Sequence, residues 1–357
     1  MNASSRPDRT PNAPVKGATL HDVARVAGVS LITASRALGN PAIVSAKTRE
    51  RVEQAVQATG YIPNLLAGGL KSRRSRMVAG IVPALSVSQF LPTVQTLTAA
   101  LHDEGYQLLL GQTFYDAERE DEVLAAMLGR QPDGIVVMGL VRSERSRERL
   151  RATGIPVVET WDISDRPVDM VIGFSHLKVG SALAGYFLAR GFRHVGIATG
   201  DDHRAMQRHA GFTAAWGSEV PTARVPAPST LESGRRALGE LLEQHPRLQA
   251  VACSSDMLAH GVLVEARARG LRVPQDLAVS GFGNAEFAAH MVPSITTVHV
   301  DGPEIGRLAA RLIVDRCRGM PADRSSFDLG FRLIERASTR ADEGDAGLPP
   351  SPDVGSE

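Results

Sequence analysis

From Met77 onward the chain alternates short apolar runs with longer amphipathic segments, and this alternation restricts the fold more than any other feature. Runs such as GIVVM at 134–138 and AVAC at 250–253 are continuously apolar. Such runs are typical of parallel strands covered on both faces, because a strand with one face in water alternates apolar and polar residues. The sequence therefore predicts an α/β fold in which helices cover both faces of parallel sheets.

The same pattern gives the expected positions of the elements. We expect strands at 77–82, 106–110, 134–138, 156–159, 170–172, 194–198, 250–253 and 277–280, and helices at 90–104, 117–128, 145–152, 176–189, 204–216, 231–243, 256–269 and 303–318. The core, 77–340, is large for one doubly wound sheet, so we expect two lobes with a ligand cleft at their strand ends. Lobe 1 is assigned to about 77–174 plus 302–340, and lobe 2 to about 175–301.

Residues 19–63 show a different pattern, in which two short helical segments are joined by a glycine. Thr19 begins a motif that resembles a capping box, and Gly28 can leave the right-handed region of backbone space. Ser30 can cap a second helix, and Ser45 can cap a third one that closes a small core. This arrangement predicts a helix-turn-helix domain.

The start of the second helix is the predicted DNA-contacting surface. Ala34, Ala37 and Leu38 are expected to face inward, which leaves the outward positions free to reach base edges in a major groove. Thymine methyl groups would give the aliphatic side chains of Leu31 and Ile32 an apolar surface to contact. The alternative is that Leu31 and Ile32 are core residues. The residues assigned to DNA contact in this domain are Thr19, Ser30, Leu31, Ile32, Thr33, Ser35 and Arg36.

Charge is distributed unevenly along the chain. Residues 1–76 contain twelve Lys or Arg and four Asp or Glu, a net charge of +8, whereas the remainder carries −7 and the whole chain +1. A compact basic head on a mildly acidic body indicates a polyanionic partner for the head alone. A solvated basic surface is the alternative.

Four motifs follow one another in the head: LHDVARVAGVS, TASRAL, VSAKTRERV and GYIPN. In this order and at this spacing they resemble the head of the lactose-repressor/galactose-repressor (LacI/GalR) family of bacterial transcriptional regulators. The α/β part is similar to the two-lobed, periplasmic-binding-protein-like core of that family. Only the arm at 1–18 and the Pro/Gly-rich tail at 341–357 lie outside the resemblance, and we expect both to be disordered.

The resemblance implies that residues 64–76 form a hinge helix or linker that becomes ordered on operator DNA. Leu70 then matches a residue that wedges into the minor groove. Gly68 and Gly69 each cost up to roughly 1 kcal/mol relative to Ala inside a helix, so we expect the hinge to be disordered without DNA. The alternative is a basic, flexible linker with no ordered state. The hinge residues assigned to DNA contact are Asn64, Ala67 and Leu70.

The resemblance also implies an effector site between the lobes. The segments VVETWDISDRPVDMVIGFSH, HRAMQRHAGF and CSSDMLAHG are most similar to the gluconate-operon repressor branch, whose effectors are sugar acids. Arg208 matches the residue that grips the effector, and Gly283 stands where sugar-binding members usually have an Asp that would repel a carboxylate. We therefore predict an aldonate such as gluconate. The residues assigned to the effector are Trp161, Asp162, Arg208, Ser255 and Gly283.

Several alternatives remain at this site. A neutral hexose is an alternative effector, and Trp161 can either stack on the ligand or only fill the core. Arg204, one turn before Arg208, is a second candidate for the carboxylate, although a solvated helix face is the favoured interpretation of it. Ser255 and Asp256 can act as helix caps without any ligand.

No catalytic motif, metal-ligand spacing or nucleotide-binding fingerprint is present, so we expect neither an enzyme nor a cofactor or metal. No apolar stretch is long enough to span a bilayer, and the first residues lack the apolar segment of a secretory signal. With only Cys253 and Cys317 available, a disulfide framework is excluded. We expect a cytoplasmic protein.

Two heads are needed to grip the half-sites of a palindromic operator on double-stranded DNA, so a homodimer is expected. Relief of repression by the small-molecule effector is the expected response, although a co-repressor would use the same parts. The second function that we consider is a solute-binding component of sugar transport. That function would require a signal peptide and no basic head.

Overall fold

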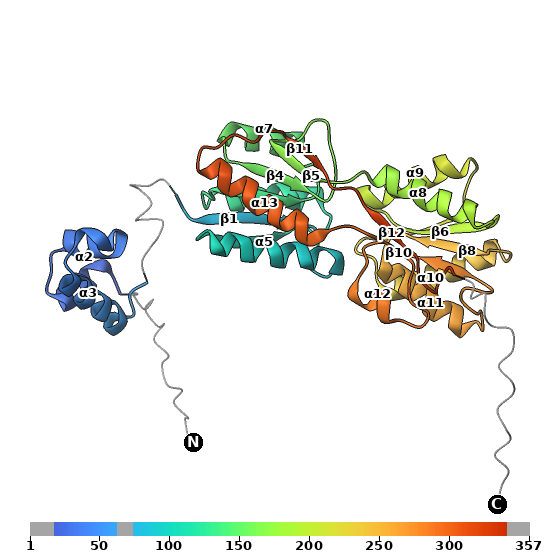
Figure 1. The fold of residues 1–357 in the computed structure, drawn as a ribbon, viewed down its shortest axis with the longest axis horizontal. Coiled ribbons are helices and arrows are strands. Elements are labelled where there is room, and N and C mark those ends of the chain that lie inside the picture. The colour runs from blue at the N-terminus through green and yellow to red at the C-terminus, as the bar shows by residue number, and fades with distance from the viewer. Residues whose placement is uncertain (1–17, 63–73, 341–357) are drawn as a thin grey trace, which may run out of the picture. The chain divides into compact units, whose positions relative to one another are not determined.

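The computed structural model describes residues 18–62 and 74–340, which divide into two units at Ser75. The first unit contains three α-helices: α1 (Leu20–Ala27), α2 (Leu31–Gly39) and α3 (Ala46–Thr59). One turn of 3-10 helix, η1 (Pro41–Ile43), lies between α2 and α3 in the chain. Figure 1 labels α2 and α3. This is the helix-turn-helix arrangement that the sequence predicts.

The helix ends in this unit are fixed by the residues that the sequence indicates. Gly28 follows α1 with φ +61°, a left-handed conformation that favours glycine, and its N–H donates to the carbonyls at the end of α1. Ser30 Oγ accepts from the backbone N–H of Thr33 at 3.1 Å, and Ser45 caps α3 in the same way. The small core that joins the three helices consists of Val23, Ala27, Ala37, Val52 and Ala55.

The second unit begins with lobe 1, a six-stranded parallel sheet in the order β11-β5-β4-β3-β1-β2. Its strands are β1 (Met77–Val82), β2 (Gln107–Gln112), β3 (Gly134–Met138), β4 (Val157–Thr160), β5 (Met170–Gly173) and β11 (Ser326–Asp328). Its helices are η2 (Ser88–Phe90), α5 (Leu91–Asp103), α6 (Ala117–Leu128), α7 (Glu144–Thr153) and α13 (Gly302–Cys317).

Both faces of this sheet are covered, which explains its continuously apolar strands. Val78 and Val82 pack in the same cluster as residues of α5 and α13, whereas Ala79 and Ile81 pack with residues of α6 and α7. The α5 and α13 helices lie side by side on one face (Figure 1). Successive residues of one strand therefore enter two different layers of core.

Lobe 2 has a four-stranded parallel sheet in the order β7-β6-β8-β9 and a separate antiparallel pair, β10-β12. The strands are β6 (Val195–Gly200), β7 (Thr222–Val225), β8 (Ala250–Cys253), β9 (Ala278–Ser280), β10 (Thr297–His299) and β12 (Arg332–Ile334). The helices are α8 (His176–Ala189), α9 (His203–Trp216), α10 (Leu231–Gln244), α11 (Asp256–Ala268) and α12 (Glu286–His290).

The chain passes between the lobes three times. Two passages, after β5 and after β10, lie where the sequence predicts them. The third follows β11, which pairs with β5 in lobe 1, and leads to β12, which pairs with β10. Ser338 then exchanges hydrogen bonds with Val279 of β9. Residues 332–339 thus pack on lobe 2, and the sequence-based assignment of all of 302–340 to lobe 1 differs from the structure here.

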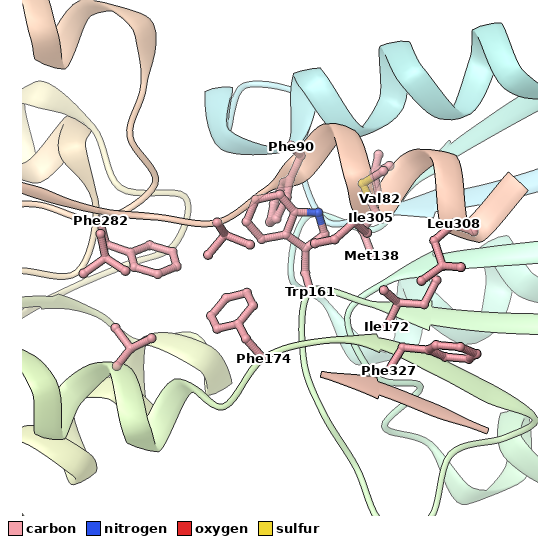
Figure 2. Packing of buried hydrophobic residues seen from close by; sticks show 14 of the residues in the cluster. Val82, Phe90, Met138, Trp161, Ile172, Phe174, Phe282, Ile305, Leu308 and Phe327 are labelled. Carbon is pink, nitrogen blue, oxygen red and sulfur yellow. The ribbon is translucent and has the colours of Figure 1, made fainter. Parts of the chain in front are cut away.

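The lobes share one apolar cluster (Figure 2). Trp161, which follows β4, lies 5.1 Å from Phe90 and 6.2 Å from Phe174, measured between ring centroids. Phe174 is at the first passage and lies 6.1 Å from Phe282 of lobe 2. A row of aromatic rings therefore runs through the junction of the lobes.

Every strand and helix expected from the alternation in 77–340 is present, with ends within two residues of those predicted. The expected hinge helix falls largely outside the described residues. The strands β7, β10, β11 and β12 and the short helix α12 were not predicted. Each of these elements has only three to five residues, too few to show a period, and each is fixed by a neighbouring element. In the part of the chain that the structure describes, no helix has the length and apolar character needed to span a membrane.

Candidate DNA-binding surface and ligand site

The start of α2 presents apolar side chains to water. Leu31 is 37% exposed and Ile32 64% exposed, and Ser35 and Arg36 are also exposed. Ala34 and Ala37 point inward and are buried. The alternative that Leu31 and Ile32 are core residues is therefore wrong, and the facing of the helix is as the sequence predicts.

Other residues assigned to DNA already make contacts within the head. The Thr19 backbone N–H donates to Asp22 Oδ2 at 2.9 Å and Thr19 Oγ1 donates to the same oxygen at 2.7 Å. The backbone bond and then the hydroxyl bond lower the pKa of the Asp22 carboxyl to about 2. Thr33 is half-buried, with its hydroxyl 2.8 Å from that of Ser30. These side chains stabilise helix ends and lie beside the exposed surface. The three hinge residues assigned to DNA, Asn64, Ala67 and Leu70, lie outside the described residues.

The second unit contains a cavity of about 310 Å³ at the carboxyl ends of the lobe 1 strands. The loops after β2 and β3 and the first turn of α6 line one side, and the first turn of α9, from lobe 2, lines the other. This is the ligand position that parallel sheets favour. The charged and phenolic residues around it include Tyr115, Glu120, Arg142, Arg147, Asp162 and Arg204.

Arg204 is a buried cation at this cavity. It is 8% exposed, its Nη1 reaches the Met138 carbonyl at 3.4 Å, and its guanidinium lies 4.9 Å from the Phe90 ring centroid. Within the described residues it forms no ion pair with a carboxylate. The favoured sequence interpretation, a solvated helix face, is therefore wrong, because contact with lobe 1 covers this side of α9.

Two buried carboxyl groups face the same cavity. Glu120 Oε1 accepts from the Arg142 backbone N–H at 3.2 Å, and Asp162 Oδ1 accepts from the Ile163 N–H at 2.8 Å. Burial raises the pKa of both carboxyls above the usual value. Among the described residues the second oxygen of each carboxyl has no hydrogen-bond partner, so each can accept from a ligand.

Arg208 lies one turn further along α9 and does not line this cavity. Its Nη1 donates to His176 Nδ1 at 2.9 Å, its Nη2 donates to the Ser254 carbonyl at 3.0 Å, and its guanidinium lies 4.1 Å from the Phe282 ring centroid. Burial is the largest cause that lowers the pKa of Arg208 to about 10. Its Nε is buried without a partner in the described part of the chain.

Trp161 is 1% exposed and lies in the shared cluster rather than on the cavity wall (Figure 2). Its Nε1 donates to Thr93 Oγ1 at 3.1 Å, and its carbonyl is 2.9 Å from His176 Nε2. Because Arg208 Nη1 donates to Nδ1, the proton of the neutral imidazole is on Nε2. His176 thus connects Arg208 of lobe 2 to Trp161 of lobe 1.

The remaining two assigned residues have structural contacts. Ser255 caps α11, accepting from the Leu258 N–H at 3.2 Å, and its hydroxyl is 3.0 Å from that of Ser229. Gly283 has φ +118°, and a Cβ there would lie 2.8 Å from Gln89 Oε1 of lobe 1. The backbone conformation itself therefore favours glycine, and a Cβ at 283 would in addition press on the Gln89 side chain of the opposite lobe, reasons for glycine that the sequence did not reveal.

Of the five residues assigned to the effector, only Asp162 lines the cavity at the carboxyl ends of the lobe 1 strands. Sequence reasoning missed Tyr115, Glu120 and Arg142. One signal was available, since Tyr115 and Arg142 lie in the loops that follow two predicted strands at their carboxyl ends. Within residues 18–62 and 74–340, no cluster of three or more His, Cys, Asp or Glu side chains has the arrangement of a metal site.

Comparison with known families gives two matches. Residues 19–64 match the family model described as bacterial regulatory proteins, lacI family. Residues 184–339 match the model of a periplasmic binding protein-like domain.

Individual relatives match over nearly the whole chain. The HTH-type transcriptional regulator GntR of Pseudomonas aeruginosa is 35% identical over 330 residues, which are 90% of this chain and 95% of that protein. GntR of Escherichia coli is 30% identical over 322 residues, 89% of this chain and 97% of that protein. The crystal structure of a LacI family transcriptional regulator from Silicibacter pomeroyi has a TM-score of 0.85 and 34% identity, and the match covers 91% of this chain and 100% of that one.

Proposed function

Because this chain belongs to the LacI family of bacterial regulatory proteins, we propose that it represses transcription from a palindromic operator as a homodimer and is released by a sugar acid such as gluconate. The chain is a DNA-binding transcriptional regulator of this family, like the relatives that match about nine-tenths of its length. The operator symmetry, the dimer and the identity of the effector are the parts that we propose.

The exposed start of α2 is the observation that supports operator reading. Leu31 and Ile32 expose apolar surface to water, and burial against thymine methyl groups would remove that surface from water. Arg36 lies on the same side and can contact phosphate or guanine. The excess of basic residues in the head adds affinity that does not depend on sequence and that falls with salt.

A buried cation supports an anionic effector. Arg204 is buried beside the cavity at the junction of the lobes and has no ion pair in the described residues. Burying a charge without a partner is costly, and a carboxylate would offset that cost. The relatives named GntR agree with a sugar-acid effector. Glu120 and Asp162 favour hydroxyl groups on the same ligand, which also keeps a neutral hexose as the second candidate.

The response to effector would follow from its position between the lobes. An inducer would bind more tightly to an arrangement of the lobes that differs from the one that holds two heads on one operator. Its binding would then reduce the population of the operator-binding arrangement. Since coupling is reciprocal, operator binding should weaken effector binding by the same factor.

The test begins with selection of an operator from a library of random DNA sequences by the purified chain. Fluorescence anisotropy then measures affinity for the selected site and for scrambled DNA, with and without gluconate, glucose or galactose. We expect preference for a palindrome and loss of affinity with gluconate. Equal binding to all sequences would contradict the DNA-reading function, and binding of glucose or galactose without gluconate would overturn the effector.

A further inference from the structure

Arg76 is the first residue of the α/β unit and immediately precedes β1. Its backbone has φ +55°, in the left-handed region that residues other than glycine, asparagine and aspartate rarely adopt. The Arg76 side chain is exposed, so burial of that side chain does not account for the backbone conformation. Such a conformation persists only where the surroundings hold it, and residues of this kind concentrate at functional sites.

Segments of lobe 1 hold Arg76 on both sides of its peptide. Asp133 Oδ2 accepts from the Arg76 backbone N–H at 2.9 Å, and the Gln107 N–H donates to the Arg76 carbonyl at 2.9 Å. The Arg76 guanidinium lies 5.2 Å from the ring centroid of Tyr106, which is itself buried. The Asp133 N–H donates to the Met77 carbonyl at 2.8 Å, which fixes the carboxylate beside the chain. We call Arg76, Tyr106 and Asp133 the linker anchor.

The linker anchor lies at the far ends of two helices that begin at the junction of the lobes. The hydroxyl of Thr93, in the first turn of α5, donates to the carbonyl of Gly302, the first residue of α13, at 2.9 Å. Cys317, the last residue of α13, donates its thiol to the Asp133 carbonyl at 3.2 Å, and α5 ends three residues before Tyr106. The two helices lie side by side (Figure 1), and α13 extends about 24 Å. They therefore connect the junction of the lobes to the linker anchor.

From this arrangement we propose that Asp133 is a positioning residue for operator binding, which holds Arg76 in its left-handed conformation and so fixes the direction in which the linker leaves lobe 1. Restricting a segment before it binds lowers the entropy lost on binding, so the anchor strengthens binding to half-sites of fixed spacing. Binding to DNA of any sequence depends on basic charge, which the anchor leaves unchanged. This inference rests on the proposed function, because it requires an operator with two half-sites.

Asp133→Ala is the first test, because electrostatics and positioning predict opposite signs for it. Removing a negative charge strengthens binding to a polyanion, whereas loss of the acceptor for the Arg76 N–H weakens binding to the operator. We expect fluorescence anisotropy of the full chain to show about tenfold lower affinity for the selected operator, on the order expected when a hydrogen-bond partner is removed. Affinity for scrambled DNA should be unchanged or higher.

Two further variants control this test. Asp133→Asn keeps a side-chain oxygen that can accept from the Arg76 N–H, so it should restore most of the operator affinity. Asp323→Ala removes an exposed carboxylate in the loop before β11 and is the matched control for charge. It should bind the operator at least as tightly as wild type does.

A second pair of variants tests the backbone conformation itself. Arg76→Asn and Arg76→Val lose the same charge, but asparagine tolerates the left-handed region and a β-branched side chain does not. We expect Arg76→Val to bind the operator about tenfold more weakly than Arg76→Asn, and the two to bind scrambled DNA equally. Affinities are measured at a temperature at which calorimetry shows the core to be folded. This pair decides the question even if Asp133→Ala does not fold.

Each result separates the linker anchor from the proposed function. If Asp133→Ala binds the operator as tightly as wild type, or loses affinity for operator and scrambled DNA equally, the anchor is wrong while the proposed function stands. Equal operator affinities of Arg76→Asn and Arg76→Val would also overturn the anchor. If wild type shows no preference among DNA sequences, the proposed function fails, and the anchor fails with it because no operator remains for it to serve.

Discussion

The candidate functional side chains of the head and of the core are each in an environment that does not suit their polarity, and the two cases are opposite. In the head, Leu31 and Ile32 are apolar side chains exposed to water. In the core, Arg204 is a charged side chain removed from water without a carboxylate partner among the described residues. Both mismatches cost free energy in the free protein, and in both a ligand of complementary chemistry would relieve the cost. Exposed apolar side chains and buried charged side chains are therefore the first candidates for ligand contacts.

The largest expected effect tests whether the two units are independent. Trp161→Ala removes a fully buried indole from the cluster that joins the lobes, so the free energy of unfolding of the core should fall by about 3–5 kcal/mol. Differential scanning calorimetry should show the transition of the core moved down and that of the head unchanged. A shift of both transitions would contradict the division into two units.

The next effect concerns the mismatch in the head. Ile32→Asp places a carboxylate opposite phosphate groups and removes an apolar contact, so affinity for the selected operator should fall at least about 100-fold. Ile32→Ala should lose roughly tenfold while the stability of the head changes by less than about 0.5 kcal/mol, because the side chain is mostly exposed. Anisotropy and thermal unfolding of the same samples give both values. A large loss of stability in Ile32→Ala would show that this residue is a core residue after all.

A third, smaller effect depends on pH. Burial, together with the nearby charge of Arg208, holds the pKa of His176 well below 6.5, so folded His176 stays neutral while unfolded His176 takes up a proton as pH falls below 6.5. Its contribution to stability is therefore present above pH 6.5 and lost below it, by somewhat over ~1 kcal/mol between pH 7.5 and 5.5. Urea unfolding of wild type and His176→Gln at both pH values separates the contribution of His176 to the free energy of unfolding from that of the other histidines. Equal pH dependence in the two proteins would contradict the assignment.

The smallest effect concerns the mismatch in the core. Arg204→Met replaces a buried cation that lacks an ion pair with an apolar side chain, so the ligand-free protein should become more stable by about 1 kcal/mol. Gluconate should no longer raise its melting temperature, although it raises that of wild type. A destabilised Arg204→Met protein would show that the guanidinium serves packing and not the ligand.

The sequence predicts a residue's conformation and exposure best where neighbours close in the chain determine them. Ser30, Ser45 and Gly28 act within one helix turn, and their roles as caps are confirmed. The exposure of Ile32 follows from helical spacing and is also confirmed. Local chemistry and period were sufficient for these residues.

Prediction was less successful where the two lobes meet. The burial of Arg204 depends on lobe 1 residues such as Phe90 and Met138, far away in the chain. The backbone of Gly283 has φ +118°, and its neighbour is Gln89 of the other lobe. The β12 strand pairs with β10, and no local sequence pattern indicates this pairing. Each of these contacts joins segments that are far apart in the sequence, and helical or strand periodicity gives no information about such contacts.

The third passage between the lobes has a practical consequence for engineering. A chimera that exchanges residues 176–300 as a single cassette would leave β12 and the Ser338 contacts behind in the recipient chain, facing a foreign partner. Effector specificity therefore cannot be transplanted as one continuous gene fragment. Grafting must move two pieces together, or must be confined to side chains around an unchanged framework.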